Sequence, residues 1–377
     1  MKIVILGTAY PYRGGLSAFN ERLASEFIKE GHDVEILTFT LQYPSFLFPG
    51  KTQYSEEPAP SNLKITRVMN SVNPFSWLHV GRMIRRMNPD LLVIKFWIPL
   101  MSPCLGTIAR IAKRNNKTKV VSVLDNVIPH EKRPLDKLLV RYFVNSIDRF
   151  VAMSDSVLSD LRFFVKHKSA ALCPHPLYDN FGAALPKAEA RKKLNIPNKQ
   201  TMLLFFGFIR DYKGLDLLME AYADNRIDKS KVRLVIAGEY YNNKDKYIEL
   251  ETALGLKGLI DWRTEFIPDS EVAIYFSAAD LIVQPYKSAT QSGVTQIAYH
   301  FEKPMLVTNV GGLAEIVPNG KVGYVTEVDA TSIADALIDF CSNPNSNRFK
   351  EGIQKEKKKY AWSRMTAAII AQENTQQ

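Results

Sequence analysis

The residue types best suited to chemistry in this chain lie in a loop after the apolar run Met202–Phe206. The loop contains Gly207, Arg210, Lys213 and Gly214, and a helical pattern follows it directly. Glycine lets the backbone approach a ligand closely, and a helix N-terminus carries partial positive charge. Arg210 and Lys213 add two full positive charges at the same place. The loop therefore predicts a binding site for an anion such as a diphosphate.

A second glycine-containing loop follows the first apolar run, Lys2–Gly7. Gly14 and Gly15 come just before a helical pattern at Ser17–Glu30, and Arg13 precedes them. Two glycines permit close backbone approach, and a helix start offers N–H groups that have no partner within the helix. The spacing does not match the Gly-x-Gly-x-x-Gly pattern of dinucleotide sites. A ligand-binding turn is one interpretation, and a plain tight turn is the other.

Polar residues also follow the central apolar run Lys119–Leu124. Asp125 and Asn126 come directly after it, at a strand end where site residues commonly lie, and His130 follows. A histidine can hydrogen-bond a hydroxyl group through either ring nitrogen. The segment is a candidate ligand-binding loop, and a structural role for the lone histidine is the alternative.

A polar turn precedes another predicted helix nearer the C-terminus. It contains Thr290, Gln291, Ser292 and Gly293. The start of this helix could meet a phosphate or a hydroxyl group through neutral hydrogen bonds. The alternative is that the turn only caps the helix.

These segments resemble retaining family 4 glycosyltransferases (glycosyl transferases group 1), which have the GT-B fold. The resemblance rests on the Gly207–Gly214 loop, on a strand that begins at Lys303-Pro304 and ends in Gly311-Gly312-x-x-Glu315, and on Gly14-Gly15. It implies an α/β protein with two Rossmann-like lobes whose parallel sheets face a central cleft, and a C-terminal helix that crosses back to the first lobe. An ordinary Rossmann-like lobe with unrelated loops is the alternative.

The resemblance also implies a role for each candidate residue. The catalytic residues would be His130, Arg210 and Lys213. The residues that bind the donor, a nucleotide sugar, would be Gly14, Gly15, Arg210, Lys213, Glu239, Ile267, Thr290, Gln291, Ser292, Gly293 and Glu315. The acceptor would be bound by Arg13, Asp125, Asn126 and His130.

The chain departs from the family at one acidic motif. Family members usually carry two glutamates separated by seven residues before the Lys-Pro strand. Counted back from Lys303-Pro304, these positions are Ala289 and Ile297. The first glutamate would contact the donor sugar and the second would bind the ribose. Because both are absent, the resemblance does not identify the donor. A nucleotide-sugar-binding GT-B protein without turnover is therefore an alternative function.

No metal ion and no cofactor are expected beside the nucleotide-diphosphate sugar. No Asp-x-Asp pair stands in a polar loop after a predicted strand, which is where a metal site of this kind would lie. The three cysteines are widely separated and form no disulfide or zinc pattern. A nucleotide-sugar epimerase is a further alternative, but it would need acid and base carboxylates that the missing glutamates do not supply.

The length of 377 residues is too great for one core and predicts two domains. Apolar runs alternate with amphipathic stretches, which indicates βα units around parallel sheets. We expect an acceptor-binding domain at residues 1–178 with the C-terminal helix at about 359–377, and a nucleotide-sugar-binding domain at 179–358. Strands are expected at Lys2–Gly7, Asp33–Phe39, Leu63–Val68, Leu91–Phe96, Lys119–Leu124, Arg149–Met153, Thr201–Phe206, Val232–Ala237, Ile260–Arg263, Leu281–Gln284, Pro304–Thr308 and Gly323–Val325.

Positive charge is concentrated in the N-terminal half. Residues 1–180 contain 24 Lys and Arg against 15 Asp and Glu, whereas the remainder contains 25 against 24. Such a lobe could attract an anionic membrane surface or a lipid-phosphate acceptor, and a solvated basic surface is the alternative. Arg82, Arg85 and Arg86, near the apolar run Phe96–Leu100, would suit such a surface. No nucleic-acid motif accompanies the charge, so nucleic acid is not an expected partner.

The expected function is therefore transfer of a sugar, with retention, from a nucleotide-diphosphate sugar to the hydroxyl of a lipid-linked or glycan acceptor. The expected process is surface-polysaccharide or glycolipid synthesis. The first apolar run is too short for a secretory signal, and no run approaches the roughly 20 residues of a membrane span. We expect a cytoplasmic protein, peripheral on the inner membrane face.

Overall fold

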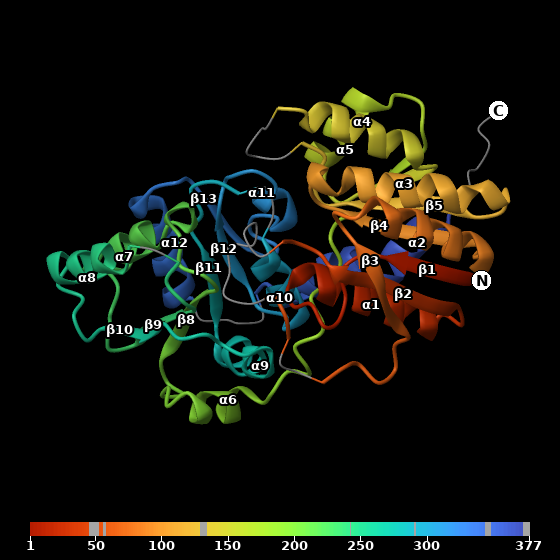
Figure 1. The fold of residues 1–377 in the computed structure, drawn as a ribbon. Helices are drawn as coiled ribbons and strands as arrows, with labels where there is room; N and C mark the ends of the chain where they lie inside the picture. Colours follow the sequence, from red (N-terminus) through yellow and green to blue (C-terminus); the bar gives the residue numbers. More distant parts are fainter. Residues whose placement is uncertain are drawn as a thin grey trace. The chain divides into compact units, whose positions relative to one another are not determined.

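The chain forms two compact α/β units (Figure 1). The structure is a computed structural model that describes residues 1–44, 53–55, 58–128, 134–241, 243–289, 292–343 and 348–371. Unit 1 comprises Met1–His175 and Trp362–Gln377, and unit 2 comprises Pro176–Ala361. The domain boundaries predicted from the sequence lie at residue 178 and at about residue 359.

Unit 1 is built on a parallel sheet with the strand order β3-β2-β1-β4-β5-β6-β7. The strands are β1 Lys2–Leu6, β2 Asp33–Leu41, β3 Ile65–Asn70, β4 Leu91–Phe96, β5 Lys119–Leu124, β6 Arg149–Ala152 and β7 Ala170–Leu172. All six predicted strands are present. The additional strand, β7, is a partly exposed edge strand of three residues, too short to produce an apolar pattern in the sequence.

The helices of unit 1 cover both faces of this sheet. They are α1 Gly15–Lys29, α2 Pro74–Met87, α3 Ser102–Ala112, α4 Asp136–Ser146, α5 Asp155–Phe164 and α14 Trp362–Ile370, with short 3₁₀ turns at Pro99–Met101 and Lys113–Asn115. Alternate strand residues point to opposite faces. Val4 and Leu6 of β1 pack in the cluster that contains the apolar residues of α2, α3, α4 and α5. Ile3 and Ile5 pack in the cluster that contains those of α1 and α14.

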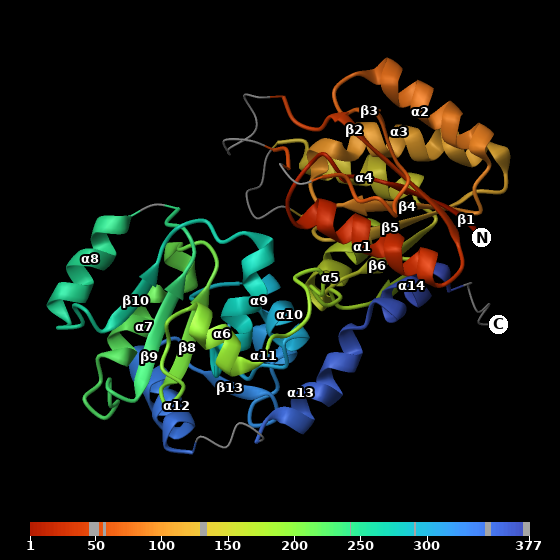
Figure 2. The same cartoon turned by 90° about the horizontal axis from the view of Figure 1, so that it is seen from below.

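The last described helix, α14, returns to unit 1, as predicted (Figure 2). Its Met365 and Ile369 are buried in the α1 face, and the Trp362 ring lies 5.1 Å from the ring of Phe19. The Thr366 hydroxyl donates a hydrogen bond of 2.6 Å to Glu30, at the end of α1. The C-terminal helix is therefore part of the core of unit 1.

Unit 2 is built on a second parallel sheet, with the strand order β10-β9-β8-β11-β12-β13. The strands are β8 Thr201–Phe206, β9 Val232–Ala237, β10 Ile260–Arg263, β11 Leu281–Gln284, β12 Met305–Thr308 and β13 Gly323–Thr326. The helices are α6 Lys187–Lys193, α7 Leu215–Tyr222, α8 Lys244–Ala253, α9 Asp269–Ala278, α10 Gly293–His300, α11 Leu313–Ile316, α12 Ala330–Ser342 and α13 Lys350–Lys357, with 3₁₀ turns at Asp211–Lys213 and Lys358–Tyr360. All six strands expected in this half are present.

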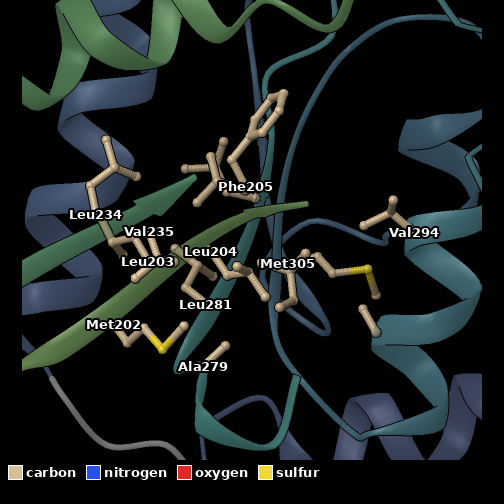
Figure 3. Packing of buried hydrophobic residues seen from close by; sticks show 14 of the residues in the cluster. Met202, Leu203, Leu204, Phe205, Leu234, Val235, Ala279, Leu281, Val294 and Met305 are labelled. Atoms are coloured by element: carbon tan, nitrogen blue, oxygen red, sulfur yellow. The ribbon is translucent and has the colours of Figure 1, made fainter. Parts of the chain in front are cut away.

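The central strand β8 anchors the core of unit 2 (Figure 3). Its residues Met202–Phe205 are buried, together with Leu234 of β9, Leu281 of β11 and Met305 of β12. Because every strand is parallel, the carboxyl ends of all strands in one sheet open onto the same edge. The loops after β8, β9 and β11 therefore meet at one edge of unit 2, and those after β1, β4 and β5 meet at one edge of unit 1.

Candidate functional site

The loop after β8 is fixed by close backbone contact with the loop after β9. Gly207 and Gly238 both have positive φ, 93° and 136°. A Cβ atom on Gly238 would lie 2.5 Å from the Gly207 carbonyl oxygen, so no larger residue fits there. The Ile209 N–H donates a hydrogen bond of 2.8 Å to the Glu239 carbonyl. These contacts leave the loop backbone little freedom.

The far end of the same loop is fixed against the segment after β11. Gly214 has a φ of 67°, and a Cβ there would lie 1.9 Å from the carbonyl oxygen of Pro285. The Lys287 N–H donates a hydrogen bond of 2.7 Å to the Tyr212 carbonyl. The two predicted cations are thus carried by a segment that is held at both ends.

Lys213 is a buried cation without a countercharge. Its side chain is 9% exposed, and no described carboxylate pairs with it. The ammonium nitrogen lies 3.1 Å from the position that a Cβ on Gly207 would occupy, and 5.7 Å from the centroid of the Tyr286 ring. Burial, and then the neighbouring charge of Arg210, lower the pKa of Lys213 to about 8. An anion bound here would relieve both effects.

Arg210 stands at the start of the same turn and is half-buried. Its guanidinium lies 3.8 Å from the centroid of the Tyr241 ring, a cation–π distance. Tyr241 belongs to the loop after β9, and its N–H donates a hydrogen bond of 3.1 Å to the Ile209 carbonyl. The structure therefore brings Arg210 and Lys213 together on one rigid loop.

The N-terminus of α10 approaches the same place. A Val294 methyl group lies 4.0 Å from the position that a Cβ on Gly207 would occupy. Ser292 caps the helix by accepting a hydrogen bond of 3.2 Å from the Val294 N–H. The Ser292 hydroxyl is also 3.2 Å from the Tyr286 hydroxyl, whose pKa burial raises. Two cations, a glycine and a helix N-terminus thus converge, and such an arrangement suits an anion.

The other residues of the polar turn divide into two groups. Gly293 packs closely on Tyr178, because a Cβ there would lie 3.1 Å from the Tyr178 ring. Thr290 and Gln291 lie outside the described residues.

Both positions of the missing glutamate pair are apolar in the structure. Ile297 is 7% exposed, and Ala289 packs against the same core. Neither position supplies a polar group.

Ile267, expected to bind the nucleotide-sugar donor, lines a cavity of about 440 Å³. The cavity lies where β10 ends and α9 begins, and its wall includes Trp262, Arg263, Phe266 and Tyr275. Aromatic, apolar and charged groups in one wall suit a flat ring with polar edges. The structure thus gives Ile267 a concave setting at the carboxyl edge of the sheet.

The structure places the two predicted acidic residues of unit 2 differently. Glu239 follows β9, and its backbone carbonyl accepts a hydrogen bond from Ile209 of the loop Gly207–Gly214, here called the cationic loop. Glu315 is exposed on the short helix α11. Its described electrostatic partner is Tyr360, whose pKa is raised to about 12 by burial first and then by Glu356 and Glu315. The described contacts join Glu239, but not Glu315, to the cationic loop.

Sequence analysis missed a buried amide at the end of β11. Gln284 is 1% exposed, and both polar atoms of its side chain lack a hydrogen-bond partner among the described residues. Burying an amide without hydrogen-bond partners lowers the stability of the folded state. A glutamine closing an otherwise apolar strand, Leu281–Gln284, is the signal that could have identified it.

In unit 1, the loop after β1 is tied to the start of α1. The Asn20 side chain donates a hydrogen bond of 2.8 Å to the Thr8 carbonyl, and Glu21 accepts one of 2.7 Å from the Tyr10 N–H. Gly14 has a φ of 102° and precedes α1 without any side-chain cap. Gly15 and Arg13 are exposed. The first turn of α1 therefore keeps N–H groups available for a ligand.

Asp125, one of the predicted acceptor residues, is paired with a lysine that sequence analysis missed. Lys95, at the end of β4, donates a hydrogen bond of 2.8 Å to Asp125, which follows β5. The Lys95 side chain is 3% exposed and that of Asp125 is 21% exposed. Asn126 is half-buried beside this pair in sequence, and His130 lies outside the described residues.

Within the described residues, no group of three or more His, Cys, Asp or Glu side chains could hold a metal ion. The free cysteines Cys104 and Cys173 are buried, and burial raises the pKa of Cys173 to about 11. Neither the thiols nor a carboxylate cluster therefore adds chemistry to the cationic loop.

Two protein families match adjoining parts of this chain. The family described as Glycosyltransferase Family 4 matches residues 13–172, within unit 1. The family described as Glycosyl transferases group 1 matches residues 186–358, within unit 2.

Curated relatives carry related names. D-inositol 3-phosphate glycosyltransferase of Rhodococcus jostii (strain RHA1) is 31% identical over 165 residues, 42% of this chain and 36% of the relative. N-acetyl-alpha-D-glucosaminyl L-malate synthase of Bacillus anthracis is 22% identical over 368 residues, 92% of this chain and 90% of the relative. The chain thus aligns with about a third of the first relative and with most of the second.

A solved structure from Anabaena, determined in complex with UDP, has a similar fold. Its TM-score is 0.70 at 15% sequence identity, and the match covers 98% of each chain. At this identity the likeness shows the fold alone, and it confirms the expected fold of each half as a Rossmann-like lobe with a parallel sheet.

The lowered pKa of Lys213 predicts pH-dependent binding of a nucleoside diphosphate. The ammonium is charged below pH 8 and becomes neutral as the pH rises through its pKa of about 8. A bound diphosphate favours the charged form, so affinity should be constant near pH 6.5–7 and fall by up to about tenfold per pH unit above 8. Calorimetry with UDP and GDP between pH 6.5 and 9.5 measures this.

The control for this measurement is Lys231→Met, at an exposed lysine just before β9. Lys213→Met should bind weakly at every pH and lose the alkaline decline, whereas Lys231→Met should behave as wild type. An affinity that stays flat through pH 9.5 in the wild type would count against Lys213 as the diphosphate ligand.

Proposed function

This chain belongs to the glycosyltransferase families that match its two units and has the GT-B fold, and we propose that it transfers a sugar, with retention of configuration, from a nucleotide-diphosphate sugar to a hydroxyl acceptor. The observation that carries the proposal is Lys213, a buried cation that has no countercharge among the described residues and stands on a rigid loop beside a helix N-terminus. A leaving diphosphate would supply the missing negative charge.

The donor would bind along the carboxyl edge of the unit 2 sheet. Arg210, Lys213 and the start of α10 would hold the diphosphate. The cavity lined by Ile267 would hold the base, and the backbone near Glu239 would border it. The UDP complex of the Anabaena structure supports UDP as the first nucleotide to examine.

The electrostatic demand of the reaction is the departing diphosphate. The bond between the anomeric carbon and the diphosphate oxygen breaks, and the acceptor oxygen bonds to that carbon from the same face. The acceptor proton passes to the departing diphosphate oxygen. Arg210 and Lys213 would stabilise the charge that develops on this oxygen.

The acceptor would bind unit 1, the more basic half of the chain. The two relatives described above are named for inositol phosphate and for malate, both anionic. The basic composition of unit 1 supports an anionic acceptor here as well. We propose an acceptor of surface-polysaccharide or glycolipid synthesis, and a small soluble anion is the alternative.

A substrate panel tests this function directly. The purified chain is incubated with UDP-, GDP- and ADP-sugars and with four acceptors: octyl α-D-glucoside, myo-inositol 1-phosphate, L-malate and a polyprenyl-diphosphate-linked sugar. Transfer with an α-linked product from an α-linked donor, read from the anomeric NMR coupling, is expected. Binding without transfer or hydrolysis would indicate a binding protein, and conversion of the donor to its epimer would indicate an epimerase.

Replacing either cation should slow transfer strongly. Arg210→Ala and Lys213→Ala should each lose about 2–4 kcal/mol of transition-state stabilisation, the cost of removing a preorganised donor to a developing oxyanion. The measured quantity is kcat/KM for the donor. Lys231→Met is the control, and near-normal turnover of both alanine variants would refute the assignment.

Activity should not depend on a divalent metal ion. The described residues offer no carboxylate or histidine cluster, and Arg210 and Lys213 can balance the diphosphate charge. Initial rates should be equal with excess EDTA and with added Mg²⁺ or Mn²⁺. A strict requirement for either ion would show that a ligand set has been overlooked.

Unit 1 should bind anionic lipid vesicles in a salt-sensitive manner. Arg82, Arg85 and Arg86 are exposed on α2, and Phe75 at its start is 80% exposed. The prediction that Phe96 contributes an apolar surface was wrong, because this β4 side chain is fully buried. No helix among the described residues is long and apolar enough to cross a membrane.

Co-sedimentation with phosphatidylglycerol vesicles at low and at high salt measures this binding. Arg82→Ser/Arg85→Ser/Arg86→Ser should weaken it, and exchange of lysines in unit 2, Lys229→Ser/Lys231→Ser, should not. Absence of binding at low salt would remove the membrane surface from the proposal and leave the transferase intact.

A further inference from the structure

Lys95 is a buried charge that the proposed transfer does not yet use. It stands at the carboxyl end of β4, and its side chain is 3% exposed. Its ammonium has two described neighbours: Asp125, at 2.8 Å, and the face of the Phe19 ring, whose centroid is 3.3 Å away. Burial lowers the pKa of Lys95, and the charge of Asp125 opposes this effect.

A purely structural reason for this pair is weak. Burying two opposite charges costs desolvation energy that their attraction barely repays, and apolar residues of similar size often give equal or greater stability. The strands around the pair already bury the apolar residues Val93 and Val123 on the same face. A lysine at this position therefore calls for a role in ligand binding.

The pair lies where ligands bind in parallel α/β sheets. Lys95 is the last residue but one of β4 and Asp125 follows β5, so both stand at the carboxyl edge of the unit 1 sheet. The alternation of β4 and β5 directs both side chains to the face covered by α1, as the contact with Phe19 of α1 shows. The uncapped start of α1 lies at this same edge and face.

Asp125 is only partly committed to this ion pair. Lys95 bonds to Oδ1, and no described group donates a hydrogen bond to Oδ2. The Asp125 side chain is 21% exposed, against 3% for Lys95. One oxygen is thus bonded from the protein interior, and the partly exposed carboxylate keeps a second oxygen without a donor among the described residues.

We propose that Lys95 is a positioning residue: it orients the Asp125 carboxylate so that Oδ2 accepts a hydrogen bond from the hydroxyl group of the sugar acceptor. The inference rests on the proposed function and adds a specificity to it. A carboxylate repels anions, so a hydroxyl of the acceptor faces Asp125, and any phosphate or carboxylate of the acceptor lies elsewhere.

Steady-state kinetics of four variants test the proposal. Lys95→Met and Asp125→Asn should each lower kcat/KM for the acceptor about tenfold or more, while KM for the donor and the affinity for UDP change less than twofold. The double variant Lys95→Met/Asp125→Asn should be no worse than Asp125→Asn, because Lys95 acts through Asp125.

The matched control is Lys113→Met. Lys113 forms a lysine–aspartate pair of 2.7 Å with Asp148 in the same unit, but Asp148 precedes β6 and lies at the opposite edge of the sheet. This variant should keep the wild-type kcat/KM for the acceptor and the wild-type KM for the donor. Unchanged acceptor kinetics in Lys95→Met, multiplicative losses in the double variant, or equal losses for donor and acceptor would each overturn the proposal.

A second measurement needs no turnover and does not need Lys95→Met to fold. In ¹⁵N-lysine-labelled protein, the Lys95 ammonium signal, identified by its change in Asp125→Asn, should shift when an acceptor of the panel is added and not when UDP is added. No shift with any acceptor would overturn the role of Lys95. Absence of transfer by the wild type would instead count against the proposed function.

Discussion

A positive charge held out of water is the constraint on which the geometry of unit 2 depends. Lys213 is buried without a carboxylate partner in the part of the chain that the structure describes, an arrangement that is costly unless the surroundings are rigid and a ligand completes it. The positive-φ glycines Gly207 and Gly214 bring backbone close on either side of it. The start of α10 adds partial positive charge and so does not neutralise the charge of Lys213. Unit 2 thus maintains an unbalanced positive site that an anion would complete.

Unit 1 also buries a lysine, but there the charge is paired with a carboxylate. Its buried lysine, Lys95, is balanced internally by Asp125 and by the ring face of Phe19. A lysine that is paired with a carboxylate attracts a free anion only weakly. The charge of Lys213 has no such described partner, so its attraction for an anion is not reduced in this way. The two lysines therefore suit different ligands: a diphosphate at Lys213, and a hydroxyl group at the carboxylate that Lys95 holds.

The loss of the glutamate pair makes this imbalance larger. Ile297 and Ala289 pack in the apolar core of unit 2, so no carboxylate from these positions offsets the charge of the cationic loop. Neutral polar groups also stand in this part of unit 2: the Ser292 cap, the Tyr286 hydroxyl and the amide of Gln284, which has no hydrogen-bond partner among the described residues. In the proposed transferase, the donor sugar and ribose would be recognised by such neutral hydrogen bonds, which distinguish hydroxyl arrangements without opposing the diphosphate.

The sequence by itself determined the α/β alternation, all twelve predicted strands and the two cations of the loop after β8. These features depend on local apolar periodicity and on residues a few positions apart, so they can be read along the chain. Only the tertiary structure decided that Lys213 has no partner carboxylate among the described residues, that Lys95 is paired with Asp125, and that Phe96 is buried. The pairing of a charge depends on strands that meet only in the folded sheet, and side-chain burial depends on the helix packed against it. Neither leaves a periodic signal in the sequence.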